Sequence, residues 1–110
     1  MGKSQRDKGA RIEREMVNRH KEIGIHAVRQ PDSGAFGTSH KKEELTGDLV
    51  IAKRFRAEVK ARVNGEGFKT LEKWLGNHDM LFLRRDAAEP LVVLPWAVYR
   101  QLLIEAQIGR

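Results

Sequence analysis

The sequence predicts an α/β fold, with a mixed sheet of about five strands flanked by helices. The chain has 110 residues, which suits a single domain, residues 1–110, with one modest core. Apolar residues follow helical spacing near both ends and again around residues 68–75. Between these segments, short apolar runs bounded by turn residues are typical of strands. The predicted order is helix, strand, loop, two strands, helix, two strands and helix.

The first helix is expected to begin near Gln5 or Arg6 and to end at about Glu22, with residues 1–5 frayed. Gly24 is placed to close this helix, because glycine adopts the left-handed conformation that often follows a helix. A strand over residues 25–29 follows. Glu13 is expected at the rim of the buried helix stripe, where it is either solvated or directed into a site beside the sheet.

Residues 32–46 are polar and rich in glycine and serine, which predicts a long mobile loop. The spacing of a phosphate-binding P-loop is absent. Lys41 and Lys42 could close on phosphate groups from this loop. An ordinary surface loop explains the same composition equally well.

The central motif is an acid, Asp48, that opens an apolar run and is followed by Glu58 and Lys60 in a second run. Glu58 and Lys60 are two residues apart, so on a strand they point to the same side, together with Arg62. Asp48 shares their face only if the hairpin turn has an odd length, for example 53–55 with Val50 opposite Glu58, or contains a bulge.

Two carboxylates near one lysine suit a hydrolytic site. The carboxylates would hold a hard divalent cation, and the lysine would orient a water or stabilise charge on a phosphate. A salt-bridged, solvated strand face is the alternative for the same residues, because a short motif is only a hypothesis.

The second half of the chain is expected to supply core elements. Residues 68–75 predict a short helix whose Phe68 and Trp74 pack in the core, and residues 80–83 and 91–94 predict buried strands. Pro95 suits the first turn of a last helix. The apolar face of this helix is large for a small core, so part of it is expected to pack against a second subunit.

Charge is distributed unevenly along the chain. Residues 1–62 carry fifteen Lys and Arg against nine Asp and Glu, whereas residues 63–110 carry six of each. A basic half with acids at its centre fits a polyanion approached through a metal, which indicates nucleic acid; a generally basic surface is the alternative. There is no cysteine, no apolar leader and no membrane-spanning run, so a cytoplasmic protein that makes no contact with membrane is expected.

Four segments in this order and spacing resemble the archaeal-type Holliday junction resolvases of the PD-(D/E)xK nuclease superfamily. They fall within residues 8–62 and are Lys8-Gly9-Ala10-Arg11-Ile12-Glu13-Arg14-Glu15, Val28-Arg29-Gln30-Pro31-Asp32-Ser33-Gly34, Gly47-Asp48-Leu49-Val50-Ile51 and Glu58-Val59-Lys60-Ala61-Arg62. Each motif is weak alone, whereas four in sequence are fairly specific.

The resemblance implies a restriction-endonuclease-like fold and a homodimer that nicks two opposed strands of a four-way (Holliday) junction symmetrically. It implies a catalytic set of Glu13, Asp48, Glu58 and Lys60. It also implies a site for Mg²⁺, which Mn²⁺ could replace, held by Asp48, Glu58 and Glu13, with the Val59 carbonyl as a further ligand. Ser33 matches a loop serine of the family, and the mobile loop would clasp DNA near the junction. The candidates for DNA-backbone contacts are Arg11, Arg14, Arg29, Ser33, Lys41, Lys42 and Arg62.

Gly47 replaces the proline that usually precedes the superfamily's aspartate, and the chain is shorter than typical members, mostly after residue 62. The source could be a virus, which would place the protein in a host cytoplasm. Two alternatives stay open: a superfamily nuclease acting on other branched, nicked or duplex DNA, and a non-catalytic junction-binding protein. Cleavage positions, sequence preference and partner proteins do not follow from the sequence.

Overall fold

The computed structural model describes residues 2–30 and 48–108. The chain divides into two compact units, residues 1–61 with 108–110 and residues 62–107. The first unit holds every described acidic residue of the predicted site, and the second holds Arg62.

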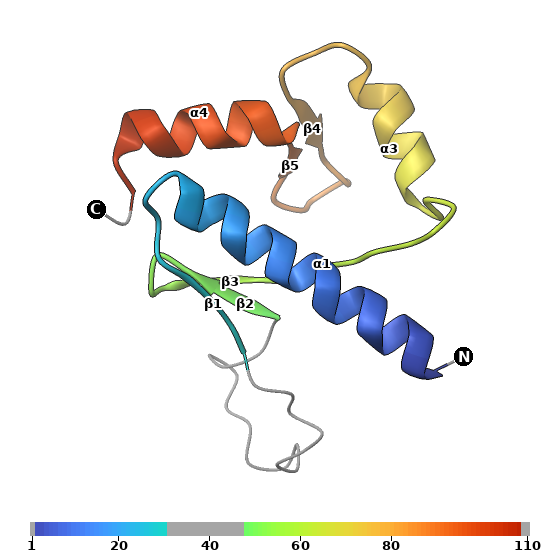
Figure 1. Ribbon diagram of the computed structural model, residues 1–110. Helices are drawn as coiled ribbons and strands as arrows, with labels where there is room; N and C mark the ends of the chain where they lie inside the picture. Colours follow the sequence, from blue (N-terminus) through green and yellow to red (C-terminus); the bar gives the residue numbers. More distant parts are fainter. Residues whose placement is uncertain (1, 31–47, 109–110) are drawn as a thin grey trace. The chain divides into compact units, whose positions relative to one another are not determined.

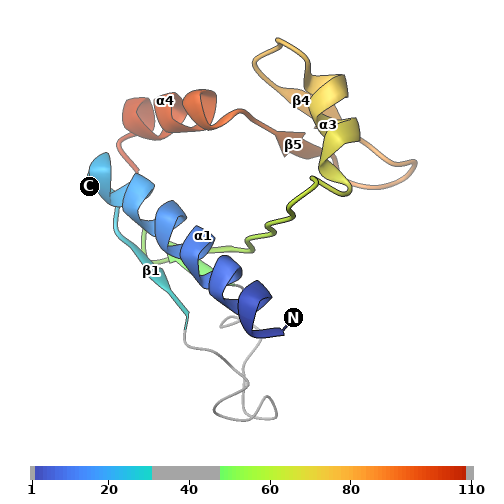
Figure 2. The same cartoon turned by 45° about the vertical axis from the view of Figure 1, so that its right-hand side comes forward.

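The first unit is a helix packed on a three-stranded antiparallel sheet. Helix α1 spans Gly2–Glu22, and the strands are β1 (Ala27–Arg29), β2 (Leu49–Ile51) and β3 (Phe55–Ala57), in the order β1-β2-β3. Two views show α1 running alongside the sheet (Figures 1 and 2). The helix begins earlier than predicted and ends where predicted, and the first strand is shorter than expected.

The core of this unit lies between α1 and the sheet. Strand alternation explains it, because Leu49 and Ile51 of β2 are buried while Val50 between them is partly exposed. The buried apolar residues of the described chain are Val17, Ile23, Ile25, Ala27, Leu49 and Ile51. All of them lie in the first unit, so this unit carries its own core.

Gly24 closes α1 as the sequence predicted. Its φ is 81°, in the left-handed region that glycine adopts without steric cost. The Gly24 N–H donates to the Lys21 carbonyl at 3.0 Å, and the Ile25 N–H donates to the His20 carbonyl at 3.0 Å. This pair of bonds is a Schellman motif, and it directs the chain from α1 straight into the buried start of β1.

The β2–β3 hairpin has the odd-length turn that the sequence argument required. Ile51 pairs with Phe55 and Val50 with Arg56, so residues 52–54 form the connection and even-numbered residues face even-numbered ones. The example given above, residues 53–55 with Val50 opposite Glu58, is wrong by two residues. The parity is confirmed, because any odd connection preserves it.

The strands of this hairpin are shorter than the sequence predicted. Strand β3 ends at Ala57, so Glu58, Lys60 and Arg62 lie in the segment after the strand and not on it. The period-two argument for these three residues therefore does not apply. Any meeting of their side chains has to be established from their contacts.

The second unit contains two helices and a two-stranded antiparallel sheet. Helix α3 spans Phe68–Leu75, as predicted, strands β4 and β5 span Leu81–Leu83 and Leu91–Val93, and helix α4 spans Trp96–Ala106. Pro95 is the residue before α4 and not its first residue, since its φ of −62° and ψ of 151° describe an extended backbone and not a helical one. Gly76 ends α3, as predicted.

Two predictions about the sheet are not met in the described residues. Their five strands form two antiparallel sheets, of three and two strands, in place of one mixed sheet. The buried character assigned to β4 and β5 is also wrong, because Phe82 is 63% exposed and Leu91 is 66% exposed. Trp74 of α3, predicted to be core, is 57% exposed. Apolar composition identified these elements, but among the described strands β4 and β5 pair only with each other.

The predicted loop at residues 32–46 lies outside the described residues. Among the residues that are described, no helix combines the length and the apolar character needed to cross a membrane.

Candidate functional site

Asp48 lies at the open end of the β2–β3 hairpin, where three segments meet. Its carbonyl accepts a hydrogen bond from Gln30 N–H at 2.8 Å, and its N–H donates to the Ala57 carbonyl at 2.8 Å. Leu49 is already paired with Ala57, so Asp48 and Leu49 both face this one residue of β3, which is the pattern of a bulge. The bulge ends regular pairing at the point where the acidic residue is needed.

The Asp48 carboxylate is held by the segment that follows β3. Its Oδ2 accepts a hydrogen bond from the Val59 N–H at 2.7 Å. A bond of this length to a carboxylate is strong, and it fixes the side chain against the backbone between Glu58 and Lys60. The fold thus brings Asp48 into contact with the Glu58-Val59-Lys60 segment, which begins ten residues later in the sequence.

Glu58 and Lys60 meet even though they do not lie on a strand. Lys60 Nζ lies 3.3 Å from Glu58 Oε2, and their side chains are 59% and 54% exposed. An ion pair this exposed contributes little to stability, because water screens it and both long side chains lose freedom. The two groups are therefore accessible to a ligand from solvent at small energetic cost.

Glu13 faces the sheet from the middle of α1. It precedes buried Val17 by one helical turn, and its carboxylate accepts a hydrogen bond from Arg29 Nε of β1 at 2.9 Å. The Glu13 side chain is only 19% exposed, against 39% for Arg29. The structure thus joins a predicted metal-site acid to a predicted DNA-contacting cation, a pairing that the sequence argument did not foresee.

The predicted catalytic residues fall into two groups of contacts. One joins Asp48 to Val59 and Glu58 to Lys60, and the other joins Glu13 to Arg29. Within residues 2–30 and 48–108, no three His, Asp or Glu side chains are grouped as they would be around one ion. The Val59 N–H contacts Asp48, and the role predicted for the Val59 carbonyl stays a prediction.

The donor chemistry of the first group fits a hard divalent cation. Asp48 and Glu58 offer carboxylate oxygens, and Asp48 keeps its Oδ1 in addition to the Oδ2 that Val59 engages. Mg²⁺ commonly binds through one or two protein carboxylates, completed by water and substrate phosphates. Asp48 and Glu58 are therefore the residues that could hold such an ion.

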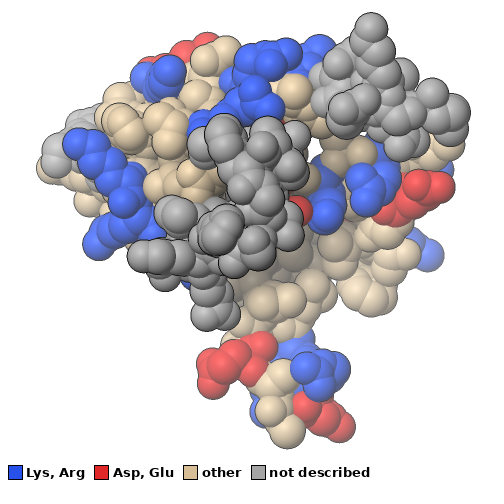
Figure 3. Space-filling view, turned by 90° about the horizontal axis from the view of Figure 1, so that it is seen from below, with Lys and Arg blue, Asp and Glu red and all other residues tan. Residues whose placement is uncertain are grey.

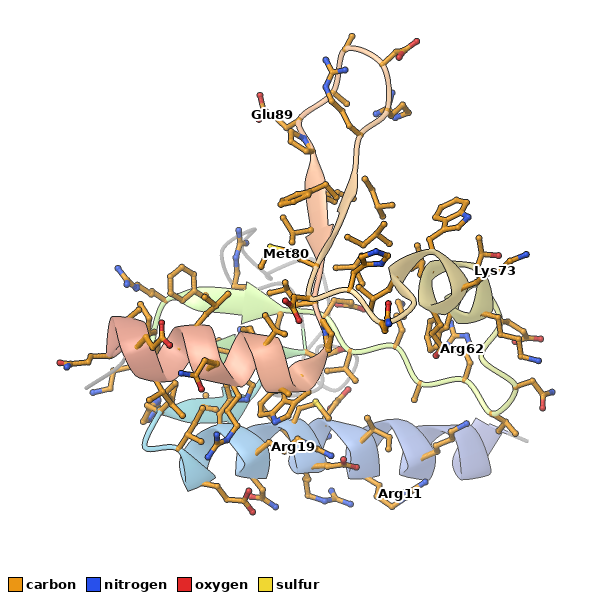
Figure 4. The ribbon with its side chains drawn as sticks, turned by 90° about the horizontal axis from the view of Figure 1, so that it is seen from above. Arg11, Arg19, Arg62, Lys73, Met80 and Glu89 are labelled. Atoms are coloured by element: carbon orange, nitrogen blue, oxygen red, sulfur yellow. The ribbon has the colours of Figure 1, made fainter. Side chains whose placement is uncertain are left out.

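The predicted DNA-contacting residues are dispersed. Arg11 and Arg14 line a surface pocket on α1 together with Glu15, Asn18, Arg19 and Glu22, at the spacing of one helix face (Figure 4 labels Arg11 and Arg19). Helical geometry turns this face away from the side that carries Glu13 and Val17. Arg62 belongs to the second unit. Ser33, Lys41 and Lys42 lie outside the described residues.

Sequence reasoning missed a set of exposed side chains at the β2–β3 turn. Lys53, Arg54 and Phe55 are exposed, and the Arg54 guanidinium carbon lies 4.6 Å from the centre of the Phe55 ring. The signal was present, because residues 49–57 contain three cations and no acid. The positive charge was overlooked because residues 49–57 were interpreted only as the connection between Asp48 and Glu58.

Comparison with known families agrees with the class of site. A family model described as archaeal Holliday junction resolvase (Hjc) matches residues 4–93, which is well over half of the chain. The chain belongs to this family, and membership implies a nuclease that acts on DNA junctions. The resemblance found in the sequence is thereby confirmed. No curated protein and no solved structure gave a match.

Proposed function

We propose that this protein resolves four-way DNA junctions by metal-dependent phosphodiester hydrolysis at Asp48, Glu58 and Lys60. The observation that carries the proposal is the 2.7 Å bond from Val59 N–H to the Asp48 carboxylate, which sets Asp48 beside the Glu58–Lys60 pair. Family membership supports DNA junctions as the substrate. An exposed Glu58–Lys60 ion pair beside the partly buried Asp48 has a clear use in hydrolysis and little use in stability.

Asp48 and Glu58 would hold Mg²⁺ through their carboxylates, with Glu13 and the Val59 carbonyl as further contributors, directly or through water. When bound, such an ion lowers the pKa of its water and offsets charge on the phosphate. Arg29 now holds Glu13 at 2.9 Å, so Glu13 would act while anchored to β1. This anchoring fixes the acid in one orientation.

Lys60 has two uses that its position supports. Its ammonium group is half exposed and tied to Glu58 only by a 3.3 Å ion pair, so it is free to approach a phosphate. There it would orient the attacking water or stabilise the negative charge that develops on the phosphate oxygens. A positive group aimed at developing charge contributes more in the transition state than in the ground state.

DNA binding and assembly complete the proposal. Arg11, Arg14, Arg29, Ser33, Lys41, Lys42 and Arg62 are the candidate contacts to the DNA backbone. Such contacts position the substrate and read no sequence. Selectivity for a four-way junction would come from the spacing of two sites across a homodimer, which would cut opposed strands in a paired manner. A restriction-endonuclease-like fold is part of the same proposal.

The test is cleavage of a labelled synthetic four-way junction beside a linear duplex built from the same arms, with and without Mg²⁺. Wild-type protein is expected to cut the junction at symmetric positions near the branch and to spare the duplex. Asp48→Asn is expected to lower the rate by at least about 10²-fold, since removing one group that stabilises transition-state charge usually costs that much. Asp86→Asn, at an exposed position in the β4–β5 connection, is the matched control and should cut normally.

Other outcomes would redirect the assignment. Equal cutting of the duplex would keep the nuclease and remove its junction selectivity. Tight junction binding without cutting, in Mg²⁺ or Mn²⁺, would contradict the proposal and leave a junction-binding protein. Equal loss of activity in the Asp86 variant would show that the Asp48 result does not report on the site.

A further inference from the structure

The β2–β3 turn presents two cations and an aromatic ring to solvent, and Lys53, Arg54 and Phe55 are called the hairpin tip below. All three are exposed, and Phe55 is 49% exposed. The Arg54 guanidinium stacks over the Phe55 ring at 4.6 Å from its centre. The interaction holds two flexible side chains together, so the tip is a defined surface.

The backbone of the turn is costly for these residues. Ala52 and Lys53 have φ of 56° and 65°, and the Arg54 N–H donates to the Ile51 carbonyl at 3.1 Å. Turns with two left-handed central residues are normally built from Asn and Gly, which adopt this conformation most easily. A chain that places Ala and Lys there accepts backbone strain at each position, and such strain often marks a functional segment.

The sheet holds the tip in place. The Ala52 N–H donates to the His26 carbonyl at 2.7 Å, which attaches the turn to the segment before β1. Leu49 and Ile51, buried under α1, fix the strand that leads into it. A lysine presented on an anchored turn loses less freedom on binding than one on a long loop.

The charge of the tip distinguishes it from the other described turn between strands. Residues 49–57 contain three cations and no acid, whereas the connection from β4 to β5 carries Arg84 and Arg85 together with Asp86 and Glu89. The mixed signs at that second turn are visible at the lower end of Figure 3. Only the first turn has the one-sided positive charge that a polyanion requires.

We propose that the hairpin tip binds the backbone of a DNA arm whose cleaved strand lies at Asp48 and Glu58. Lys53 and Arg54 contact phosphates, and Phe55 packs against a deoxyribose, since the bases of a paired arm are stacked inside it. Lys53 follows Asp48 by five residues, of which three form β2, so the two positions are at most about 17 Å apart. Phosphates on one strand repeat about every 3.4 Å, so the contacted phosphates lie roughly five nucleotides from the cleaved bond. The identity of this ligand rests on the proposed function.

The test measures DNA binding in EDTA, where no cutting occurs, as a function of salt. Each phosphate contact contributes about 0.9 to the slope of log K against log salt, so Lys53→Gln with Arg54→Gln should reduce the slope by about 1.8. Lys53→Arg with Arg54→Lys keeps both charges and should retain the slope. Phe55→Ala should weaken binding and leave the slope unchanged, because the ring carries no charge.

The matched control removes two exposed cations elsewhere, with Lys69→Gln and Lys73→Gln on α3. This variant should keep the wild-type slope. An equal fall in slope would overturn the inference, because it would show a general effect of charge. An unchanged slope in the Lys53 and Arg54 variant would overturn it directly. Thermal unfolding of each variant shows that the comparison is made between folded proteins.

A second measurement locates the contact. Replacing single phosphates by uncharged methylphosphonates along one arm should weaken wild-type binding most at about five nucleotides from the cleaved bond. The Lys53 and Arg54 variant should lose this sensitivity, and unchanged sensitivity would contradict the inference. Failure of wild type to cut in Mg²⁺, with the salt-slope results intact, would refute the proposed function alone. Failure of wild type to bind DNA would refute both.

Discussion

The two β-hairpins of this protein have strands of equal length and opposite surroundings. Strands β2 and β3 pair over three residues each, and so do β4 and β5. Leu49 of the first hairpin is 2% exposed, whereas Leu91 of the second is 66% exposed. The first hairpin has a third strand and α1 against it, whereas β4 and β5, among the described strands, pair only with each other.

The difference shows that apolar sequence does not by itself decide burial. Strands β4 and β5 read Leu-Phe-Leu and Leu-Val-Val, yet each has a residue more than half exposed; β3 reads Phe-Arg-Ala. Burial in the first hairpin comes from what covers it, because a two-stranded ribbon alone has no interior. Experiments on matched positions of the two hairpins test this comparison.

The largest expected effect is on the stability of the first hairpin. Leu49→Ala should lower the free energy of unfolding by about 2–5 kcal/mol, since it removes buried methyl groups and leaves a cavity. Leu91→Ala, the same change at an exposed position, should lower it by less than about 0.5 kcal/mol. Urea unfolding followed by tryptophan fluorescence and circular dichroism measures both. A comparable loss in the Leu91 variant would show that the second hairpin is covered in solution.

An intermediate effect is expected from the turns. Ala52→Asn with Lys53→Gly should raise the free energy of unfolding by about 1 kcal/mol. The left-handed conformation costs an ordinary residue about 1–2 kcal/mol, which Asn and Gly largely avoid. Part of this gain is offset because Gly makes the unfolded chain more flexible. Ala87→Gly in the second hairpin, where φ is 61°, relieves one residue and should give a smaller gain. Thermal melting compares the two variants. A loss of stability in the Ala52 and Lys53 variant would contradict the left-handed conformation of these two residues. The same variant should bind DNA more weakly.

The smallest effect concerns Tyr99, which follows the second hairpin in α4. Burial raises the pKa of Tyr99 above its ordinary value of 10.0, and its ring centre lies 5.2 Å from that of Trp96. A raised pKa in the folded state means that the contribution to stability is complete below pH 10 and is lost as the pH rises through the folded pKa. Tyr99→Phe should remove this loss.

The chain has one tyrosine, so its ultraviolet absorbance reports this titration directly. Titration near pH 10 in the folded protein would show that the Trp96–Tyr99 contact is open to water. That outcome would show that α4, like β4 and β5, is exposed to water.

Much of the local structure was predictable. The bounds of α3 and the closure of α1 at Gly24 followed from local patterns of a few residues. The odd length of the β2–β3 turn did not, because it was only a condition under which Asp48 could share a face with Glu58 and Lys60. The positions of Glu58 and Lys60 relative to β3 did not, because strand length depends on where a partner stops pairing. The Glu13–Arg29 contact was also beyond reach, since it joins residues sixteen apart across two elements.

The sequence by itself determined the element order, the family motifs and the candidate residues, because helical and strand periodicity and motif spacing are written along the chain. Only the tertiary structure decided that Asp48 is held by Val59, that Glu13 is held by Arg29, and that the basic turn at Lys53 and Arg54 is anchored through Ala52. The physical reason is that these relations depend on strand register and helix packing. Register and packing are fixed by contacts between residues distant in sequence, and one local pattern is compatible with several registers.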